Sequence, residues 1–212
     1  MTDITAARLV VMFGKIAAAI EAEKDRLCAL DGVIGDADHG IAMSLGFSAA
    51  RDALAALDPA ADPTTVFNTA AKSFLNAVGA SSGPLYATAL MRAGASAKGK
   101  AALTDADFVA AFQAMAKGIQ DRGKAERGEK TMIDAWLPAA DAAGECISAG
   151  GGLAASLEAA VSAAKAGAEA TKGMVAAKGR AERLGERSLG HMDPGAASAV
   201  VVIEAIRDAV AN

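Results

Sequence analysis

Apolar residues recur three and four positions apart along almost the whole chain, and this spacing restricts the fold more than any other feature. Each such segment gains one apolar face when it forms an α-helix. Aromatic residues make up only 4% of the 212 residues, so the core must consist mainly of Ala, Leu, Val, Ile and Met, which favours closely packed helices. No segment has the pattern of a convincing strand. Helices are predicted over residues 4–30, 41–57, 64–78, 84–97, 104–120, 131–147, 153–175 and 196–211.

The connections between these predicted helices are mostly short and rich in glycine or proline. Short connections make neighbouring helices antiparallel. We therefore expect an all-α fold, an eight-helix antiparallel up-down barrel or bundle, with residues 1–212 forming a single domain. In this topology the connections that follow the first, third, fifth and seventh helices lie at the same end.

The composition argues against several classes of protein. A formal net charge of −4 gives no basic surface for nucleic acid. Although 53% of the residues are hydrophobic, no uncharged run reaches the roughly 18 residues of a membrane-spanning helix, so no membrane partner is expected. Residues 1–10 lack the basic start and apolar block of a signal peptide. Cys28 and Cys146 lie within apolar helical patterns, as expected of buried thiols in a reducing, cytoplasmic compartment.

The segment at 31–40, D-G-V-I-G-D-A-D-H-G, is the strongest candidate for chemistry. Asp31, Asp36 and Asp38 would repel one another unless a cation lay among them, and hard cations such as Mg²⁺ take carboxylate oxygens as ligands. Two plainer interpretations stay open, an acidic surface turn and an N-cap at Asp36. The segment is not an EF-hand, because the twelfth position from Asp36 is Phe47, where that loop needs a bidentate Glu.

Two other connections carry residues that suit a phosphate. The segment G-A-S-S-G-P at 79–84 offers two hydroxyls before a predicted helix, whose N-terminal N–H groups and partial positive charge attract anions. The segment R-G-E-K-T-M at 127–132 places Lys130 and Thr131 at another helix start. Taken alone, each has a plainer interpretation, an ordinary capping turn for the first and a solvated charged loop for the second.

The last connection, G-R-A-E-R-L-G-E-R-S-L-G-H-M-D-P-G-A at 179–196, supplies arginines that suit anionic oxygens, followed by a rigid Asp-Pro-Gly turn. The segment G-A-S-A-K-G-K-A at 94–101 only imitates a phosphate-binding loop, because Ala101 replaces the hydroxyl that binds metal and the segment follows a helix. Carboxylates for Mg²⁺, glycine-serine turns and a basic loop at one end of the bundle predict a bound nucleoside diphosphate or triphosphate.

At this point the chain resembles the L-subunit family of bacterial dihydroxyacetone kinases, which is similar to the C-terminal nucleotide-binding domain of single-chain dihydroxyacetone kinases. The resemblance implies a nucleotide-binding, all-α barrel that holds ADP or ATP at one end through two Mg²⁺ ions. The family often has Asn where this chain has Ala42. The matching stretches, in the family's order, are I-G-D-A-D-H-G at 34–40, G-A-S-S-G-P-L-Y at 79–86, G-E-K-T-M-I-D-A at 128–135 and the segment at 179–196.

The resemblance also implies the site residues. Asp31, Asp36 and Asp38 would be the metal ligands, and no side chain would act as a covalent nucleophile. The residues expected to meet the nucleotide are His39, Gly40, Ala80, Ser81, Ser82, Gly123, Met132, Arg180, Asp193, Pro194 and Gly195.

In this family the substrate is held covalently on a histidine of a separate K subunit, so the resemblance implies such a partner. Transfer of the terminal phosphoryl group to dihydroxyacetone or a similar short ketose is the expected reaction. In one version ADP stays bound and is rephosphorylated by a phosphohistidine-carrying M subunit of the phosphotransferase system, which a free-standing small subunit favours. In the other version ATP exchanges freely. The rival hypotheses are a nucleotide-sensing partner of a regulator and a helical scaffold with a structural metal. Ala-rich faces leave room for a homodimer.

Overall fold

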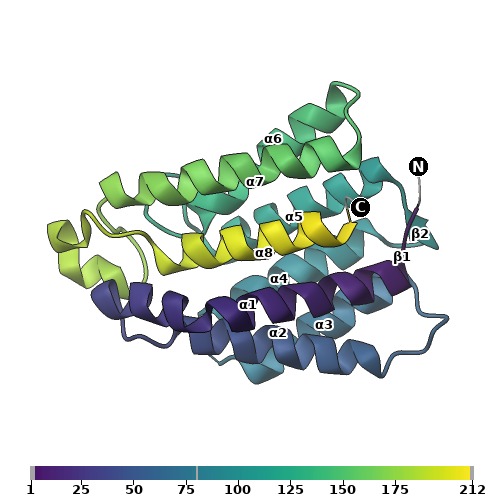
Figure 1. Ribbon diagram of the computed structural model, residues 1–212, viewed down its shortest axis with the longest axis horizontal. Coiled ribbons are helices and arrows are strands. Elements are labelled where there is room, and N and C mark those ends of the chain that lie inside the picture. Colours follow the sequence, from purple (N-terminus) through teal and green to yellow (C-terminus); the bar gives the residue numbers. More distant parts are fainter. Residues whose placement is uncertain (1–2, 80, 211–212) are drawn as a thin grey trace.

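The structure is a computed structural model, and it describes residues 3–79 and 81–210. Within these residues it has eight α-helices, two 3₁₀ segments and one pair of very short strands (Figure 1). The elements are β1 (Ile4–Thr5), α1 (Ala6–Ile34), α2 (His39–Ala55), α3 (Pro63–Ala77), α4 (Ser82–Ser96), β2 (Ala102–Leu103), α5 (Asp105–Gly123), α6 (Ile133–Ser148), α7 (Leu153–Ala170), η1 (Thr171–Gly173), η2 (Arg180–Ser188) and α8 (Pro194–Val210).

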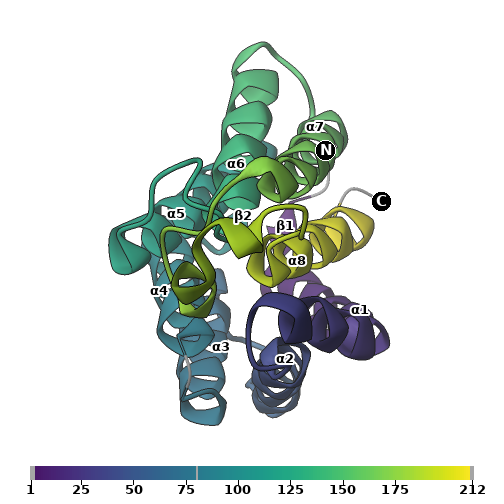
Figure 2. The same ribbon diagram turned by 90° about the vertical axis from the view of Figure 1, so that its left-hand side faces the viewer.

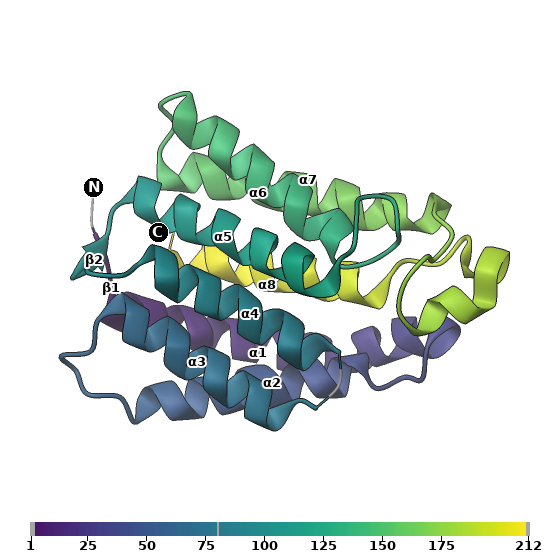
Figure 3. The ribbon, with the colours of Figure 1, turned by 180° about the vertical axis from the view of Figure 1, so that it is seen from behind.

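The helices form a closed antiparallel ring. Each one packs against its neighbour in the chain, and α8 returns to pack against α1 (Figure 2). From behind, α3, α4 and α5 form the near wall (Figure 3). The predicted all-α, eight-helix up-down barrel is therefore confirmed. No helix in the described part of the chain has the length and apolar character needed to span a bilayer.

A line of ring contacts fills the middle of the barrel despite the low aromatic content. Phe47 meets both Phe74 and Tyr86 edge-on, with ring centroids 5.0 and 5.6 Å apart. Tyr86 in turn meets Trp136 at 6.3 Å, and all four side chains are almost completely buried. Edge-to-face pairs at these separations add stability beyond the area they bury. Alanines on the surrounding helices let the backbones approach this aromatic line closely.

Several helix ends differ from the predicted ones for local reasons. The first helix continues to Ile34 instead of ending at residue 30, so Asp31 lies in its last turn. The third helix begins at Pro63 and is capped by Asp62, whose side chain accepts the Thr65 N–H at 2.7 Å, instead of by Thr64. Pro at the first helical position needs no N–H partner, which explains the earlier start. The capping box of Thr104 and Asp107 is confirmed.

One small strand pair was not predicted. Ile4 pairs with Leu103 and Thr5 with Ala102 in an antiparallel register, which ties the start of α1 to the connection before α5. Two-residue strands are too short for an alternating pattern to be visible in the sequence. This pair lies at the end of the barrel where the described chain begins and ends, whereas the connections after α1, α3, α5 and α7 lie at the other end (Figure 1).

Candidate functional site

A pocket of about 460 Å³ opens at the end where the connections after α1, α3, α5 and α7 meet. This volume lies in the range of roughly 300–1,000 Å³ that is usual for small-molecule sites. Its lining combines charged and polar side chains with apolar ones. The apolar lining residues are Ile34, Pro84, Leu85, Ile119, Ala125, Met132, Ile133 and Pro194.

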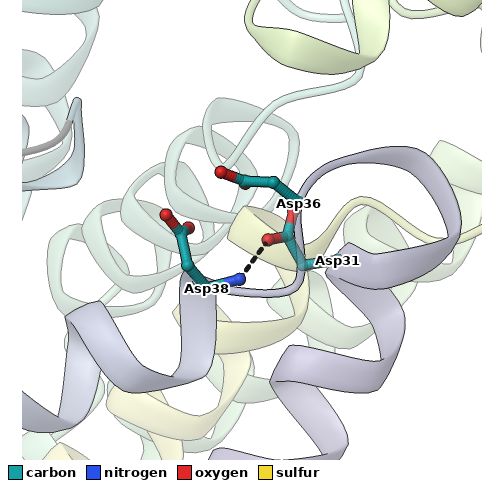
Figure 4. Close-up of side chains that lie close together, drawn as sticks. All are labelled: Asp31, Asp36 and Asp38. Atoms are coloured by element: carbon teal, nitrogen blue, oxygen red, sulfur yellow. Dashed lines mark hydrogen bonds between the residues drawn. The ribbon is translucent and has the colours of Figure 1, made fainter.

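Three carboxylates converge at this pocket. Asp31 is buried in the last turn of α1, whereas Asp36 and Asp38 are more exposed in the turn that leads to α2. One oxygen from each can be chosen so that all three lie within 4.8 Å of one another (Figure 4). Asp38 holds the N-cap position of α2 without a side-chain capping hydrogen bond. The plainer interpretation of Asp36 as an N-cap is therefore wrong.

The backbone of this turn is arranged around Asp31. Oδ2 of Asp31 accepts the backbone N–H groups of Asp38 at 3.0 Å and His39 at 3.2 Å. A Cβ at Gly35 would overlap Oδ1 of Asp31 and lie 2.9 Å from its Cγ, so only glycine fits there. Ala37 takes the left-handed conformation with φ +64°, which is unfavourable for a residue with a side chain. The backbone of this turn is thus locally strained, and the strained conformation brings the three carboxylates together.

The electrostatics of the cluster favour a cation. Burial, followed by the neighbouring charge of Asp36, raises the pKa of Asp38 above its usual value. Arg180 partly offsets this effect, because its guanidinium pairs with Asp36 and lies 3.8 Å from Oδ2 of Asp38. Three carboxylates, of which two are open to the pocket, are the ligand set that a hard divalent cation takes. The residues present therefore fit Mg²⁺.

His39 stands beside the carboxylates as the first residue of α2. Its Nε2 lies 2.8 Å from Oγ of Ser198 on α8, and its backbone N–H is held by Asp31. Burial lowers the pKa of the imidazole below its usual value, although the charge of Asp31 acts in the opposite direction. The ring is thus held between the acidic turn and the last helix, at the wall of the pocket.

The start of α4 faces the same space. Ser82 is buried in its first turn, and Ser81 is the N-cap residue without a side-chain capping hydrogen bond. Both serines line the pocket. A helix N-terminus with two small hydroxyl side chains suits an anionic oxygen group.

The connection between α5 and α6 is more ordered than a solvated charged loop. Lys130 is only 1% exposed, and its ammonium group donates to the carbonyl of Thr171 at 2.6 Å and to that of His191. Asp134 accepts the backbone N–H groups of Gly128 at 2.6 Å and Thr131 at 2.9 Å. For Lys130 the plainer interpretation is therefore wrong, and its ammonium group ties the connection between α5 and α6 to the connection between α7 and α8.

Asp193 closes the pocket where α8 begins. Its carboxylate accepts the backbone N–H of Ala196 at 2.7 Å, and its own N–H donates to Oγ1 of Thr171 at 2.9 Å. Burial raises the pKa of Asp193 to about 7, even though this capping bond and Lys130 act in the opposite direction. A carboxyl group with this pKa changes its charge near neutral pH, close enough to Lys130 and to Asp31 for their charges to act on it.

The structure brings most of the predicted site residues to this one pocket. Gly40 is an exception: it lies off the pocket wall, and a Cβ there would overlap the Lys24 carbonyl, so its role is close packing of α2 on α1. Ala80 lies outside the described residues. Ala42 is part of α2 and packs partly against the core. The predicted residues that line the pocket are Asp31, Asp36, Asp38, His39, Ser81, Ser82, Gly123, Met132, Arg180, Asp193, Pro194 and Gly195.

Sequence reasoning missed other residues around the site. Arg122, in the last turn of α5, and Lys178 also line the pocket, but exposed basic residues in charged segments give no signal of their own. Ser198 lies behind His39 inside the apolar pattern of the last helix, where a buried serine resembles the alanines around it.

Comparison with known proteins relates this chain to one family. Residues 33–208 match the model of the DAK2 domain. The PEP-dependent dihydroxyacetone kinase, ADP-binding subunit DhaL, of Escherichia coli (strain K12) is 39% identical over 182 residues, which cover 86% of each chain. The Homo sapiens triokinase/FMN cyclase is 33% identical over 199 residues, which are 94% of this chain and 34% of that protein.

A solved structure is also similar to this chain over almost its whole length. The dihydroxyacetone kinase from C. freundii in complex with AMP-PNP and Mg²⁺ matches with a TM-score of 0.75 and 26% sequence identity. The match covers 98% of this chain but only 35% of that one, so this chain spans about a third of the length of that kinase. Together these similarities confirm the family resemblance that the four sequence motifs predicted.

Proposed function

The chain belongs to the DAK2 domain family, and from this premise we propose that it is the nucleotide-binding phosphotransferase subunit of a dihydroxyacetone kinase. The whole of residues 1–212 then serves as one nucleotide-binding unit. The observation that carries the proposal is the convergence of three carboxylates with His39 and the serines of α4 in one pocket. The E. coli relative is named as an ADP-binding subunit, which supports the same assignment.

The mixed lining of the pocket suits both ends of a nucleotide. Apolar residues such as Met132 and Leu85 suit a base, whereas the carboxylates, serines and basic residues suit phosphates. Asp31, Asp36 and Asp38 would hold Mg²⁺, as two ions in our proposal. When bound, the metal neutralises charge on the phosphate oxygens during transfer.

The other side chains then bind and orient the nucleotide. Ser81, Ser82 and the N–H groups at the start of α4 donate hydrogen bonds to phosphate oxygens. Arg180, which already reaches into the acidic turn, is within range of the same phosphates. No side chain needs to act as a covalent nucleophile, because phosphoryl transfer rests mainly on positioning and charge neutralisation.

The acceptor is proposed to come from a partner. A K subunit would present dihydroxyacetone or a similar short ketose, held covalently on its histidine. An M subunit carrying a phosphohistidine would then rephosphorylate the bound ADP. The name of the E. coli relative, a PEP-dependent kinase subunit, supports this relay over free exchange of ATP. A relative from Mycolicibacterium smegmatis named L-erythrulose 1-kinase keeps four-carbon ketoses among the candidate acceptors.

The proposal is tested by nucleotide binding. Asp36→Ala should lose metal and ADP together. Its circular dichroism should stay helical, because Asp36 is an exposed member of the cluster and lies in the turn between α1 and α2. Asp52→Ala is the matched control, since Asp52 is exposed on α2 and pairs only with its neighbour Arg51. Isothermal titration with ADP at millimolar Mg²⁺ measures both. Tight ADP binding by Asp36→Ala would contradict the scheme.

A second measurement separates the transferase from a nucleotide-sensing protein. The purified chain is denatured and the released small molecules are identified by mass spectrometry. Copurified ADP supports the relay version. The chain loaded with ATP is then mixed with a K subunit and dihydroxyacetone, and transfer of the terminal phosphoryl group to the sugar is followed. Binding without transfer under these conditions would favour the sensing role.

A further inference from the structure

Ser198 lies between His39 and other buried polar groups of the barrel core. Its side chain is completely buried on α8, and Oγ lies 2.8 Å from Nε2 of His39 and 3.0 Å from the carbonyl oxygen of Gly195. The hydroxyl of Tyr86 lies in the same part of the core, close enough for Ser198 to lower its pKa, although burial raises that pKa overall. That hydroxyl accepts the indole N–H of Trp136 at 3.4 Å. Buried polar groups of α6, α4 and α8 therefore gather behind the first residue of α2, at the pocket wall.

The hydrogen of Ser198 can be assigned from its two contacts. The carbonyl of Gly195 only accepts a hydrogen bond, whereas Oγ of Ser198 carries one hydrogen and can also accept. The single hydrogen of Ser198 then has two candidate acceptors. If it went to His39, Oγ and the Gly195 oxygen would face each other at 3.0 Å with no hydrogen between them. The assignment that places a hydrogen in every contact has Ser198 donating to Gly195.

In that assignment Ser198 accepts a hydrogen bond from Nε2–H of His39. We propose that Ser198 is a positioning residue for His39, which fixes the imidazole as its Nε2–H tautomer and leaves Nδ1 as the ring nitrogen that serves the pocket. The backbone N–H of His39 is bonded to Asp31, so the residue is fixed from α1 as well as from α8. A partner on one ring nitrogen commonly decides which nitrogen meets the ligand.

The consequence for ligands rests on the proposed function. The lone pair of Nδ1 in the neutral ring accepts a hydrogen bond from a hydroxyl or a water molecule on the bound nucleotide. Without Ser198, the Nε2–H group has no partner on the buried side and the ring can turn. The nucleotide would then lose a pre-organised acceptor.

The first experiment needs no ligand. The imidazole nitrogens of His39 are observed by ¹⁵N NMR near pH 8, and because the chain has only two histidines, His191→Gln leaves one set of signals. We expect a protonated Nε2 and an unprotonated Nδ1. Ser198→Ala should disturb this pattern. Ser156→Ala is the matched control, because Ser156 is also completely buried in a helix but its Oγ has no hydrogen-bond partner in the described structure.

The second experiment measures coupling. Ser198→Ala should weaken binding of ADP in the presence of Mg²⁺ by roughly three- to tenfold, the range for one lost hydrogen bond. Ser156→Ala should leave the affinity unchanged. The loss should vanish when Ser198→Ala is made in a His39→Ala background, because the effect acts through the ring. A purely structural role of Ser198 would weaken binding equally in both backgrounds.

Three results would overturn the proposal: an Nδ1–H tautomer in the parent protein, an unchanged nitrogen pattern in Ser198→Ala, or the same loss of affinity with and without His39. If Ser198→Ala fails to fold, the tautomer of the parent protein still decides, and Ser198→Cys, which keeps a weak acceptor, should show a partial effect. A parent protein that binds no ADP contradicts the proposed function, and the nitrogen signals then decide this inference separately.

Discussion

Gly167 is a point where α7 and α6 approach so closely that one added methyl group should measurably destabilise the barrel. A Cβ at this position would overlap the carbonyl oxygen of Asp134 and lie 3.0 Å from its carbonyl carbon and 3.4 Å from Cα of Ala135. Because these neighbours are backbone atoms, no side-chain rotation relieves the clash. The two helices must separate.

The expected magnitude of Gly167→Ala follows from two opposing effects. Overpacking in a well-packed interior costs about 1–3 kcal/mol. The better helix propensity of alanine offsets roughly 1 kcal/mol. We therefore expect a net loss of up to about 2 kcal/mol in the free energy of unfolding, and a fall in Tm of up to roughly 8 °C for a chain of this size. Urea denaturation and a thermal melt give the two values.

Gly14→Ala is the matched control for this change. Gly14 lies within α1, and a Cβ there would meet no atom within 4 Å. The same substitution should therefore stabilise the protein by about 1 kcal/mol. Because Asp134 holds the connection that lines the pocket, Gly167→Ala should also weaken ADP binding, whereas Gly14→Ala should not. Equal stability changes in the two variants would refute the packing argument.

Two further variants test the buried charges at the pocket. Because burial raises the pKa of Asp193 to about 7, the folded state holds this proton more tightly than the unfolded state, and stability falls as pH rises from about 4 to 7. Asp193→Asn should remove that dependence. In urea melts with EDTA, the free energy of unfolding of the variant relative to the parent should therefore rise by roughly 2–3 kcal/mol between pH 5 and pH 8. The same pH dependence of stability in both proteins would contradict this. Lys130→Met should cost about 1–3 kcal/mol and expose the 171–193 connection to proteolysis, because both carbonyl tethers are lost. Lys98→Met, at an exposed position, should change neither, and equal proteolysis of the two variants would count against the tether.

Helix periodicity predicted the barrel because the apolar spacing of each segment is a local property. The ends of helices were less predictable. Asp31 and Gly32 resemble the start of a loop, yet α1 continues past them to Ile34. The side chain of Asp31 is held by N–H groups seven and eight residues further on, and local propensity does not include such a partner.

The site was predictable where charged or small residues gather in motifs, and not where backbone atoms are the partners. Lys130 was expected in a charged connection, but its partners are carbonyl oxygens 41 and 61 residues away. Ser198 gave no signal at all, because its contact with His39 joins residues 159 positions apart. Backbone acceptors and buried serines leave no pattern in a single sequence.

Both ends of the described chain, and the turns after α2, α4 and α6, lie at the pole of the barrel away from the pocket (Figure 1). A linker attached there leads away from the pocket, whichever terminus it extends. This geometry allows the domain to be fused to another protein at either terminus, or circularly permuted at those turns, without changing the pocket. The matches in which this chain corresponds to only a third of a longer kinase are consistent with such reuse.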